Sequence, residues 1–345
     1  MDLSIAGILL LDGVTNGAIY ALLAMAIVLL FAVTRVIFIP QGEYVAFGAL
    51  TVGLFQLGQV PGTVWFLLCL AGLAALLDAI ADLRARRPLA GAAWRALRTL
   101  AFPVAVSALA IWLAPQKPPL LVQALLTLAL VTPFGPLVYR LAYRSLAEAS
   151  VLVLLIVSVG VHFALTGLGL FFFGAEGFRN PSFWDQRFTL GPLSLSGQAL
   201  IIFAATAALI VMLWLFFGRT LHGKALRATA VNQLGARLMG ISSETAGRLS
   251  FTMAAFIGAL SGLLIGPTTT IYYDSGFLIG LKGFVAAVFA GLASYPAAMA
   301  GALIVGVLEA FSSFWASAFK EVIVFTFILP VLLWRSLRDP HTDED

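Results

Sequence analysis

Charged residues are scarce in this sequence. Only 10% of its 345 residues are Asp, Glu, Lys or Arg, against about 25% in an ordinary soluble domain. This scarcity excludes a chain that exposes most of its surface to water. Cysteine is nearly absent as well, since Cys69 is the only one. An internal disulfide is therefore excluded.

Motifs that carry chemistry are also missing. No phosphate-binding loop of the form G-x-x-x-x-G-K-[ST] occurs, so we expect this chain to bind no cofactor and to leave ATP to partner subunits. No Ser-His-Asp order, HExxH motif or paired-carboxylate helix occurs either, which disfavours an intramembrane enzyme. The isoelectric point near 9.4 is explained by basic loops on one side of a membrane, so we expect no nucleic-acid partner.

Apolar residues dominate instead: 61% of the chain is hydrophobic, 27 residues are Phe, and the mean hydropathy is +1.03. A helix that crosses a bilayer needs about 20 mostly apolar residues, and backbone in hydrocarbon must satisfy its own hydrogen bonds. The sequence therefore predicts an all-α integral membrane protein, a polytopic bundle of about 10–11 transmembrane helices forming one domain over residues 1–345. The predicted spans are 5–31, 43–58, 63–81, 99–114, 119–138, 150–173, 197–217, 247–266, 278–293, 296–313 and 321–334.

The stretch 278–313 is interrupted by Tyr295-Pro296, so it is either two short spans or one broken helix. Small residues recur every four positions in two of the spans. Because lipid gives no hydrophobic drive between helices, such stripes predict close helix packing; they are Gly13, Gly17 and Ala21, and Gly258, Gly262 and Gly266.

Basic residues set the predicted orientation. Fifteen of the 20 Lys and Arg residues fall in connections that these spans place on one side, namely 82–98, 139–149, 218–248, the connection with Arg35 after the first span, and the C-terminus. The positive-inside rule makes that side cytoplasmic. The N-terminus is then outside and the C-terminus inside, and segment 174–196 is the largest external loop, expected to form an interfacial cap.

The cytoplasmic loop 218–248 contains the stretch "GKALRATAVNQLGARLMGI", which carries three positive charges and no acidic residue. Asn232 is placed to cap a short helix through "QLGARLM", Gly240 to end it, and Ser242 or Ser243 to cap the next span. Such short helices are marginal alone, so something must pack on them. The alternative is a basic loop that only fixes topology.

This loop resembles the cytoplasmic coupling segment of ABC importer permeases, in particular the LivH-like branched-chain amino acid permease family. Two further stretches agree in order: 12–33 resembles the family's first helix, and 280–313 resembles its C-terminal signature, including Lys282 and Glu309. Asn232 stands where the family usually has an acidic residue. The matching loop residues are Gly223, Lys224, Ala225, Arg227, Ala228, Ala230, Ala236, Leu238, Gly240 and Ile241.

The resemblance implies the membrane subunit of an ABC importer in a bacterial inner membrane, in contact with membrane lipid. It implies a second permease subunit (LivM-like or a copy of this chain), two ABC ATPase subunits and a periplasmic solute-binding protein. The expected substrates are branched-chain amino acids or related small solutes. Of the loop residues, it implies an ATPase-coupling role for Gly223, Lys224, Arg227, Ala228, Ala230, Ala236, Leu238 and Gly240.

Two regions depart from the family pattern. The family usually carries N-F-A-H-G-[ED] after the first helix, whereas this chain has "FIPQGE". Pro40 and Gly42 are expected to break the helix, which favours a pathway-lining role for Gln41, Gly42 and Glu43; the alternative is a cytoplasmic turn with Glu43 as a helix-start carboxylate. Residues 82–118 are expected to be an insertion that adds two spans and one basic loop.

Three further ionisable residues lie in predicted spans. Glu309 must face protein or water, because a carboxylate at the bilayer centre costs roughly 2.5–3.5 kcal/mol. Lys282 is near the start of its span, and His162 is expected to be a packing residue. The alternative function is an ion-coupled secondary transporter that uses Glu309 and His162 together. Dependence of uptake on ATP rather than on a proton gradient distinguishes the two.

Overall fold

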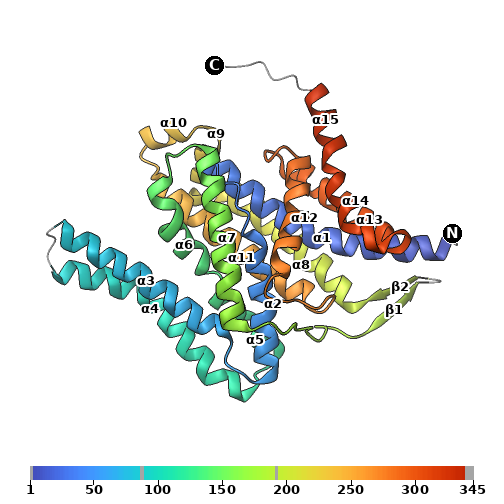
Figure 1. Cartoon of the computed structure of the whole chain (residues 1–345), viewed down its shortest axis with the longest axis horizontal. Coiled ribbons are helices and arrows are strands. Elements are labelled where there is room, and N and C mark those ends of the chain that lie inside the picture. Colours follow the sequence, from blue (N-terminus) through green and yellow to red (C-terminus); the bar gives the residue numbers. More distant parts are fainter. Residues whose placement is uncertain (1–2, 86–88, 191–192, 339–345) are drawn as a thin grey trace.

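The computed structural model describes residues 3–85, 89–190 and 193–338, and Figure 1 shows a bundle of long helices. Short 3-10 or π-helical turns are Ala114–Gln116, Tyr139–Tyr143, Arg144–Leu146 and Ser317–Phe319. The main helices are α1 (Leu3–Thr34), α2 (Gln41–Leu57), α3 (Gly62–Arg84), α4 (Leu89–Leu113), α5 (Leu120–Val131), α6 (Phe134–Val138), α7 (Val151–Phe173), α8 (Gly197–Arg219), α9 (Leu221–Val231), α10 (Gln233–Leu238), α11 (Ser243–Ile265), α12 (Ser275–Phe289), α13 (Tyr295–Trp315), α14 (Lys320–Thr326) and α15 (Ile328–Arg338).

The all-helical prediction is confirmed, and eight helical stretches within the described residues are long and apolar enough to cross a membrane. The other three predicted spans are shorter: α2 has 17 residues, α12 has 15, and 321–334 divides between α14 and α15. Because a spanning helix needs about 20 residues, these elements need protein around them. The eight stretches are Ser4–Thr34, Gly62–Arg84, Trp94–Gln116, Leu120–Leu146, Val151–Phe173, Gly197–Arg219, Ser243–Ile265 and Tyr295–Trp315.

Helix α2 is short because its chain turns back into the bundle before the helix begins. Val36 and Phe38, in the connection after α1, are buried. Pro40 is the N-cap residue of α2, and the side chain of Gln41 donates to the carbonyl of Ala254 at 2.9 Å, in the middle of α11. Helix α2 therefore starts at mid-depth, where irregular backbone is tolerated only against protein or a water-filled cavity.

Small residues allow the close approach of α1 to α13 and of α2 to α11, as the sequence predicted. A Cβ at Gly13 would lie 2.6 Å from the Val307 backbone, and one at Gly262 would lie 2.2 Å from the carbonyl oxygen of Val45. Neither site can hold a side chain without moving a helix. Backbone contact of this kind holds the bundle together in lipid.

The interruption at Tyr295-Pro296 gives two separate helices. Helix α12 ends at Phe289, and the Ser294 side chain accepts from the amide of Ala297 to start α13, with Pro296 in its first turn. Proline fits there because the first amides of a helix have no intrahelical partner.

The predicted external segment 174–196 contains the two-stranded antiparallel hairpin of β1 (Arg187–Leu190) and β2 (Leu193–Ser196), with Arg187 opposite Ser196. In Figure 1 this hairpin lies near the N-terminus, while α9 and α10 lie at the other end of the bundle and α3 with α4 projects as a hairpin from its side. Among its described residues, segment 82–118 comprises the end of α3 and one stretch long enough to cross a membrane, Trp94–Gln116. Arg86 and Arg87 of the predicted basic loop lie outside the described residues.

Candidate translocation pathway and coupling surface

Two short helices form the centre of loop 218–248. Asn232 Oδ1 accepts from the amide of Gly235 at 2.8 Å and caps α10, Gly240 ends the helix with a φ of 83°, and Ser242 Oγ caps α11. These three features were predicted from the sequence. A second helix, α9, precedes them, capped by the hydroxyl of Thr220 at 3.0 Å from the amide of Gly223.

The eight proposed coupling residues divide by exposure. Gly223 and Ala236 are buried against this chain itself, so neither offers a docking surface, and Ala230 is half-buried. The other five are exposed: Lys224, Arg227, Ala228, Leu238 and Gly240. The structure adds three exposed apolar neighbours that the motif did not point to, since exposure depends on how the two helices lie: Val231, Leu234 and Met239.

The same two helices are joined firmly to the membrane helices. Leu226 of α9 is buried with Leu29 and Val33 of α1 and with Ala246 of α11. The Gln233 side chain donates to the Val33 carbonyl at 2.7 Å. A displacement of α9 and α10 would therefore pull directly on α1 and α11.

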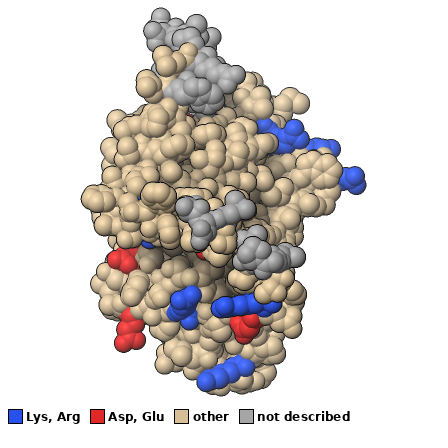
Figure 2. All heavy atoms as spheres, turned by 90° about the vertical axis from the view of Figure 1, so that its right-hand side faces the viewer, with Lys and Arg blue, Asp and Glu red and all other residues tan. Residues whose placement is uncertain are grey.

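A polar cavity of about 630 Å³ lies at the opposite end of α1, lined by Asp12 and Tyr20 of that helix and by Lys282 and Glu309. Figure 2 views the end of the molecule on which the N-terminus lies and shows charges of both signs gathered around a hollow in a mostly uncharged face. The cavity and α9–α10 thus occupy the two ends of the bundle.

Lys282 is the centre of an ion network in this cavity. Its Nζ lies 2.5 Å from Glu309 Oε1 and 3.2 Å from Glu321 Oε1, and the Tyr20 hydroxyl donates to Glu309 Oε2 at 2.6 Å. Lys282 and Glu309 are buried, so the network satisfies charges that would be costly alone. Tyr20 and Glu321 were not identified from the sequence, because only the tertiary structure brings α1, α13 and α14 together.

Gln41, Gly42 and Glu43 lie elsewhere, buried between α2 and its neighbours and outside that cavity. A Cβ on Gly42 would lie 1.8 Å from the carbonyl oxygen of Gly276 and 2.8 Å from the amide nitrogen of Gly280. The first turn of α2 therefore packs directly on the first turns of α12. Gly42 thus sets the crossing of two short helices, while Gln41 bonds to α11 and Glu43 to α7.

His162 is a buried partner of Glu43, with 3.0 Å between Nδ1 and Oε1. It also packs against Phe277 at 4.8 Å between ring centroids. The ion-coupled alternative placed His162 with Glu309, but in the described structure their polar partners are different residues: Glu43 and Thr166 for the histidine, and Lys282 and Tyr20 for Glu309. The Glu43 partnership could not be read from the sequence, because it joins residues 119 positions apart.

Among the described residues, no group of three or more His, Cys, Asp and Glu side chains is arranged to hold a metal ion. The polar residues of the cavity are two lysines, three carboxylates, an asparagine and several hydroxyls, which suit a polar solute or structural ion pairs. Such side chains can bind and orient a solute.

The fold and the site define a multi-pass helical membrane protein of the permease class. The profile of the family described as "Branched-chain amino acid transport system / permease component" matches residues 98–332. This match covers more than half of the chain, and the chain belongs to this family. It is a permease component of an ABC importer and not an ATPase.

Two relatives by sequence agree with this assignment. The high-affinity branched-chain amino acid transport system permease protein BraD of Pseudomonas aeruginosa is 31% identical over 240 residues, 67% of this chain and 78% of that protein. The corresponding LivH protein of Escherichia coli is 30% identical over 60% of this chain and 69% of its own length. The solved structure of PsaBC from Streptococcus pneumoniae in complex with Fab aligns with 93% of this chain and 89% of that chain at 11% identity and a TM-score of 0.37.

Proposed function

We propose that this chain imports branched-chain amino acids or closely related small solutes across a bacterial inner membrane, with its N-terminus outside and its C-terminus in the cytoplasm. The membership of the chain in a branched-chain amino acid permease family supports the substrate class. Family membership also implies ATPase and binding-protein partners, and the absence of a phosphate-binding loop in the sequence requires that ATP is hydrolysed on other chains.

The observation that carries this proposal is the separation of the polar cavity from an exposed helical surface at the two ends of α1. The exposed surface consists of α9 and α10, with Leu238 80% and Met239 83% exposed. Large apolar side chains beside basic ones on a water-facing loop fit a protein partner. We propose that this surface docks in a groove of the ATPase. The contacts of Leu226 and Gln233 with α1 would transmit the closure of the ATPases to the membrane helices.

The pathway lies between this chain and a second permease subunit, either LivM-like or another copy. We assign Lys282 and Glu309 to its lining at the external end, because they line the cavity with Tyr20. Gln41, Gly42 and Glu43 anchor the first turn of α2, which borders the pathway, to α11, α12 and α7 respectively. The binding protein delivers solute at the cavity end.

Uptake by cells that lack and regain this gene tests the function. We expect loss of labelled leucine, isoleucine and valine uptake on deletion, recovery on complementation, and little change when a protonophore removes the proton gradient while ATP is maintained. Uptake of a sugar serves as the control. Abolition of leucine uptake by the protonophore at constant ATP would contradict an ATP-driven importer, and unchanged uptake on deletion would contradict the substrate class.

A further inference from the structure

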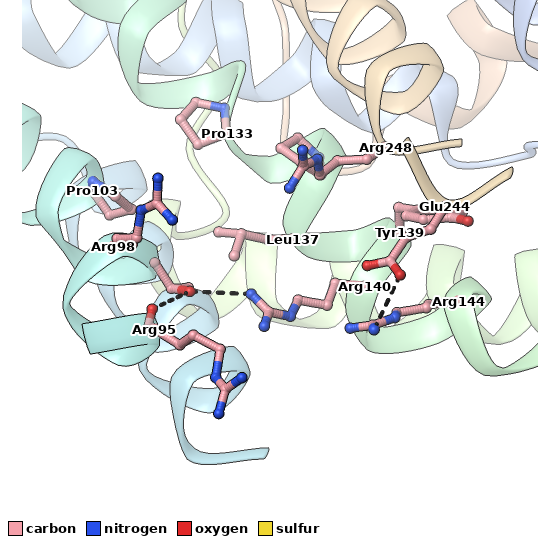
Figure 3. A pocket seen from close by; sticks show the side chains of 12 residues that line it. Arg95, Arg98, Pro103, Pro133, Leu137, Tyr139, Arg140, Arg144, Glu244 and Arg248 are labelled. Atoms are coloured by element: carbon pink, nitrogen blue, oxygen red, sulfur yellow. Dashed lines mark hydrogen bonds and ion pairs between the residues drawn. The ribbon is translucent and has the colours of Figure 1, made fainter. Parts of the chain in front are cut away.

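A second cavity, of about 600 Å³, lies on the side of the bundle near the loops rich in arginine. It is bordered by α4, by the π-helical turn Tyr139–Tyr143 with Arg144 after it, and by the first turns of α11. Figure 3 shows the arginine side chains of these three elements gathered around one space. They are Arg95, Arg98, Arg140, Arg144 and Arg248.

The charges around this cavity do not balance. Three arginines have a carboxylate partner: Arg95 pairs with Asp82 at 2.8 Å, Arg140 with Asp78, and Arg144 with Glu244 at 3.1 Å. The structure records no partner for the side chains of Arg98 and Arg248 among the residues that it describes, and both are exposed. Five guanidinium groups against three carboxylates leave two positive charges facing the cavity.

The cavity is also amphipathic. Pro103, Pro133 and Leu137 line it beside the arginines, and the outer face of α4 exposes Trp94, 59%, and Phe102, 56%. These apolar groups belong to stretches long enough to cross a membrane. A ligand that fits both parts needs an anionic head and an apolar body.

We propose that this cavity binds the phosphate headgroup of an anionic phospholipid, with Arg98 and Arg248 as the residues that contact the phosphate oxygens. Planar guanidinium groups bind phosphate by paired, charge-assisted hydrogen bonds. Basic pockets between membrane helices on the cytoplasmic side, where the proposed orientation places this cavity, are suited to anionic headgroups. Arg95 and Arg140 are held in place by Asp82 and Asp78, so they shape the wall and add to the positive potential. The acyl chains would run along the apolar outer face of α4.

Native mass spectrometry of the purified full-length chain tests this with phosphatidylglycerol, which is anionic, and phosphatidylcholine, which carries no net charge. The wild-type chain should retain a first phosphatidylglycerol molecule at least about tenfold more tightly than phosphatidylcholine. In the double variant Arg98→Gln/Arg248→Gln, the affinity for phosphatidylglycerol should fall about thirtyfold at low salt. The matched control Arg84→Gln/Arg219→Gln removes the same charge from exposed arginines outside the cavity and should bind like wild type.

Thermal unfolding of each variant establishes that it is folded. The variant Arg98→Lys/Arg248→Lys should recover part of the affinity, because it keeps the positive charges but lacks the paired guanidinium donors. Two results would overturn the proposal. One is equal loss of binding in the control and in the cavity variant, which would indicate only a diffuse surface charge. The other is displacement of bound phosphatidylglycerol by inorganic phosphate at similar affinity, which would assign the cavity to a soluble anion.

Discussion

At the scale of single residues, Lys282 balances more than one charge in the cavity. It faces two carboxylates, Glu309 and Glu321, while Glu309 has Tyr20 as a second donor. Removing one partner of a buried pair leaves an uncompensated charge, which is more costly than replacing both. The two partners of this pair are therefore not equivalent.

Lys282→Met should lower the free energy of unfolding by about 3–5 kcal/mol, because it leaves Glu309 and Glu321 without their cation. Glu309→Gln should cost less, since Lys282 keeps Glu321 at 3.2 Å. The double variant Lys282→Met/Glu309→Leu should be more stable than Lys282→Met alone. Thermal unfolding in detergent measures all three, and equal losses in both single variants would show that the network is not as asymmetric as the contacts indicate.

Gly42 gives a second prediction at this scale. Gly42→Ala should destabilise the chain by about 1–3 kcal/mol or more, because the new methyl group meets backbone atoms that cannot turn away. Gly72 of α3 has no atom within 4 Å of an added Cβ, so Gly72→Ala is the matched control and should be neutral or stabilising through helix propensity. A Gly42→Ala protein that unfolds at the wild-type temperature would contradict the close crossing of α2 and α12.

At the scale of elements, α9 and α10 present two kinds of residue. Ala236 faces inward and is 5% exposed, whereas Leu238 of the same helix faces away from the chain. A bulky residue at Ala236 therefore disturbs the packing of α10, and a change at Leu238 alters only what docks there. The motif alone treats both as coupling residues.

Leu238→Ser/Met239→Ser should reduce solute uptake about tenfold or more, because the variant removes two apolar side chains that anchor the ATPase interface. Membrane insertion and thermal stability should stay at wild-type levels, while the ATPases should hydrolyse ATP without transport. The control Leu57→Ser changes an exposed apolar residue at the C-terminal end of α2, away from α9 and α10, and should not affect coupling. Normal uptake by the double variant would contradict the docking assignment.

Gly240 belongs with these two residues, since its φ of 83° costs about 1–2 kcal/mol for a residue with a Cβ. Gly240→Leu should misplace the end of α10 without meeting any neighbour. We expect reduced uptake with normal insertion, measured by the same transport and expression assays.

At the scale of the whole molecule, orientation is the feature on which the proposed function depends. The cavity faces the outside and α9–α10 face the ATPases only if the N-terminus is external. The single cysteine allows a direct test, because Cys69→Ser gives a background without thiols. Single cysteines can then be introduced at exposed sites at each end of the bundle.

In intact cells, a membrane-impermeant maleimide should label Thr189→Cys, in β1, and should not label Leu238→Cys. After permeabilisation both should react, which controls for accessibility. Labelling of Leu238→Cys in intact cells would reverse the orientation, and the ATPase-docking proposal would fall with it.

Much of the fold follows from the sequence, for reasons that are local. Eight of the predicted spans coincide with long apolar helices because length and hydropathy decide membrane insertion. The caps at Asn232 and Ser242 and the stop at Gly240 were predictable because each depends on a few adjacent residues. The span count could not be read in the same way, because α2 begins inside the bundle after Pro40 and α12 has only 15 residues, and both depend on packing against distant helices.

Composition and local motifs thus determined by themselves that this is a many-spanning helical membrane protein, and the motifs of loop 218–248 and of 280–313 pointed to its permease family. Only the tertiary structure decided that Glu43 pairs with His162, that Lys282 joins Glu309 to Glu321, and that Arg98 and Arg248 share one cavity. The reason is physical: hydropathy and capping act over a few turns of one helix, whereas ion pairs and cavities form between residues that helix packing brings together from distant parts of the chain.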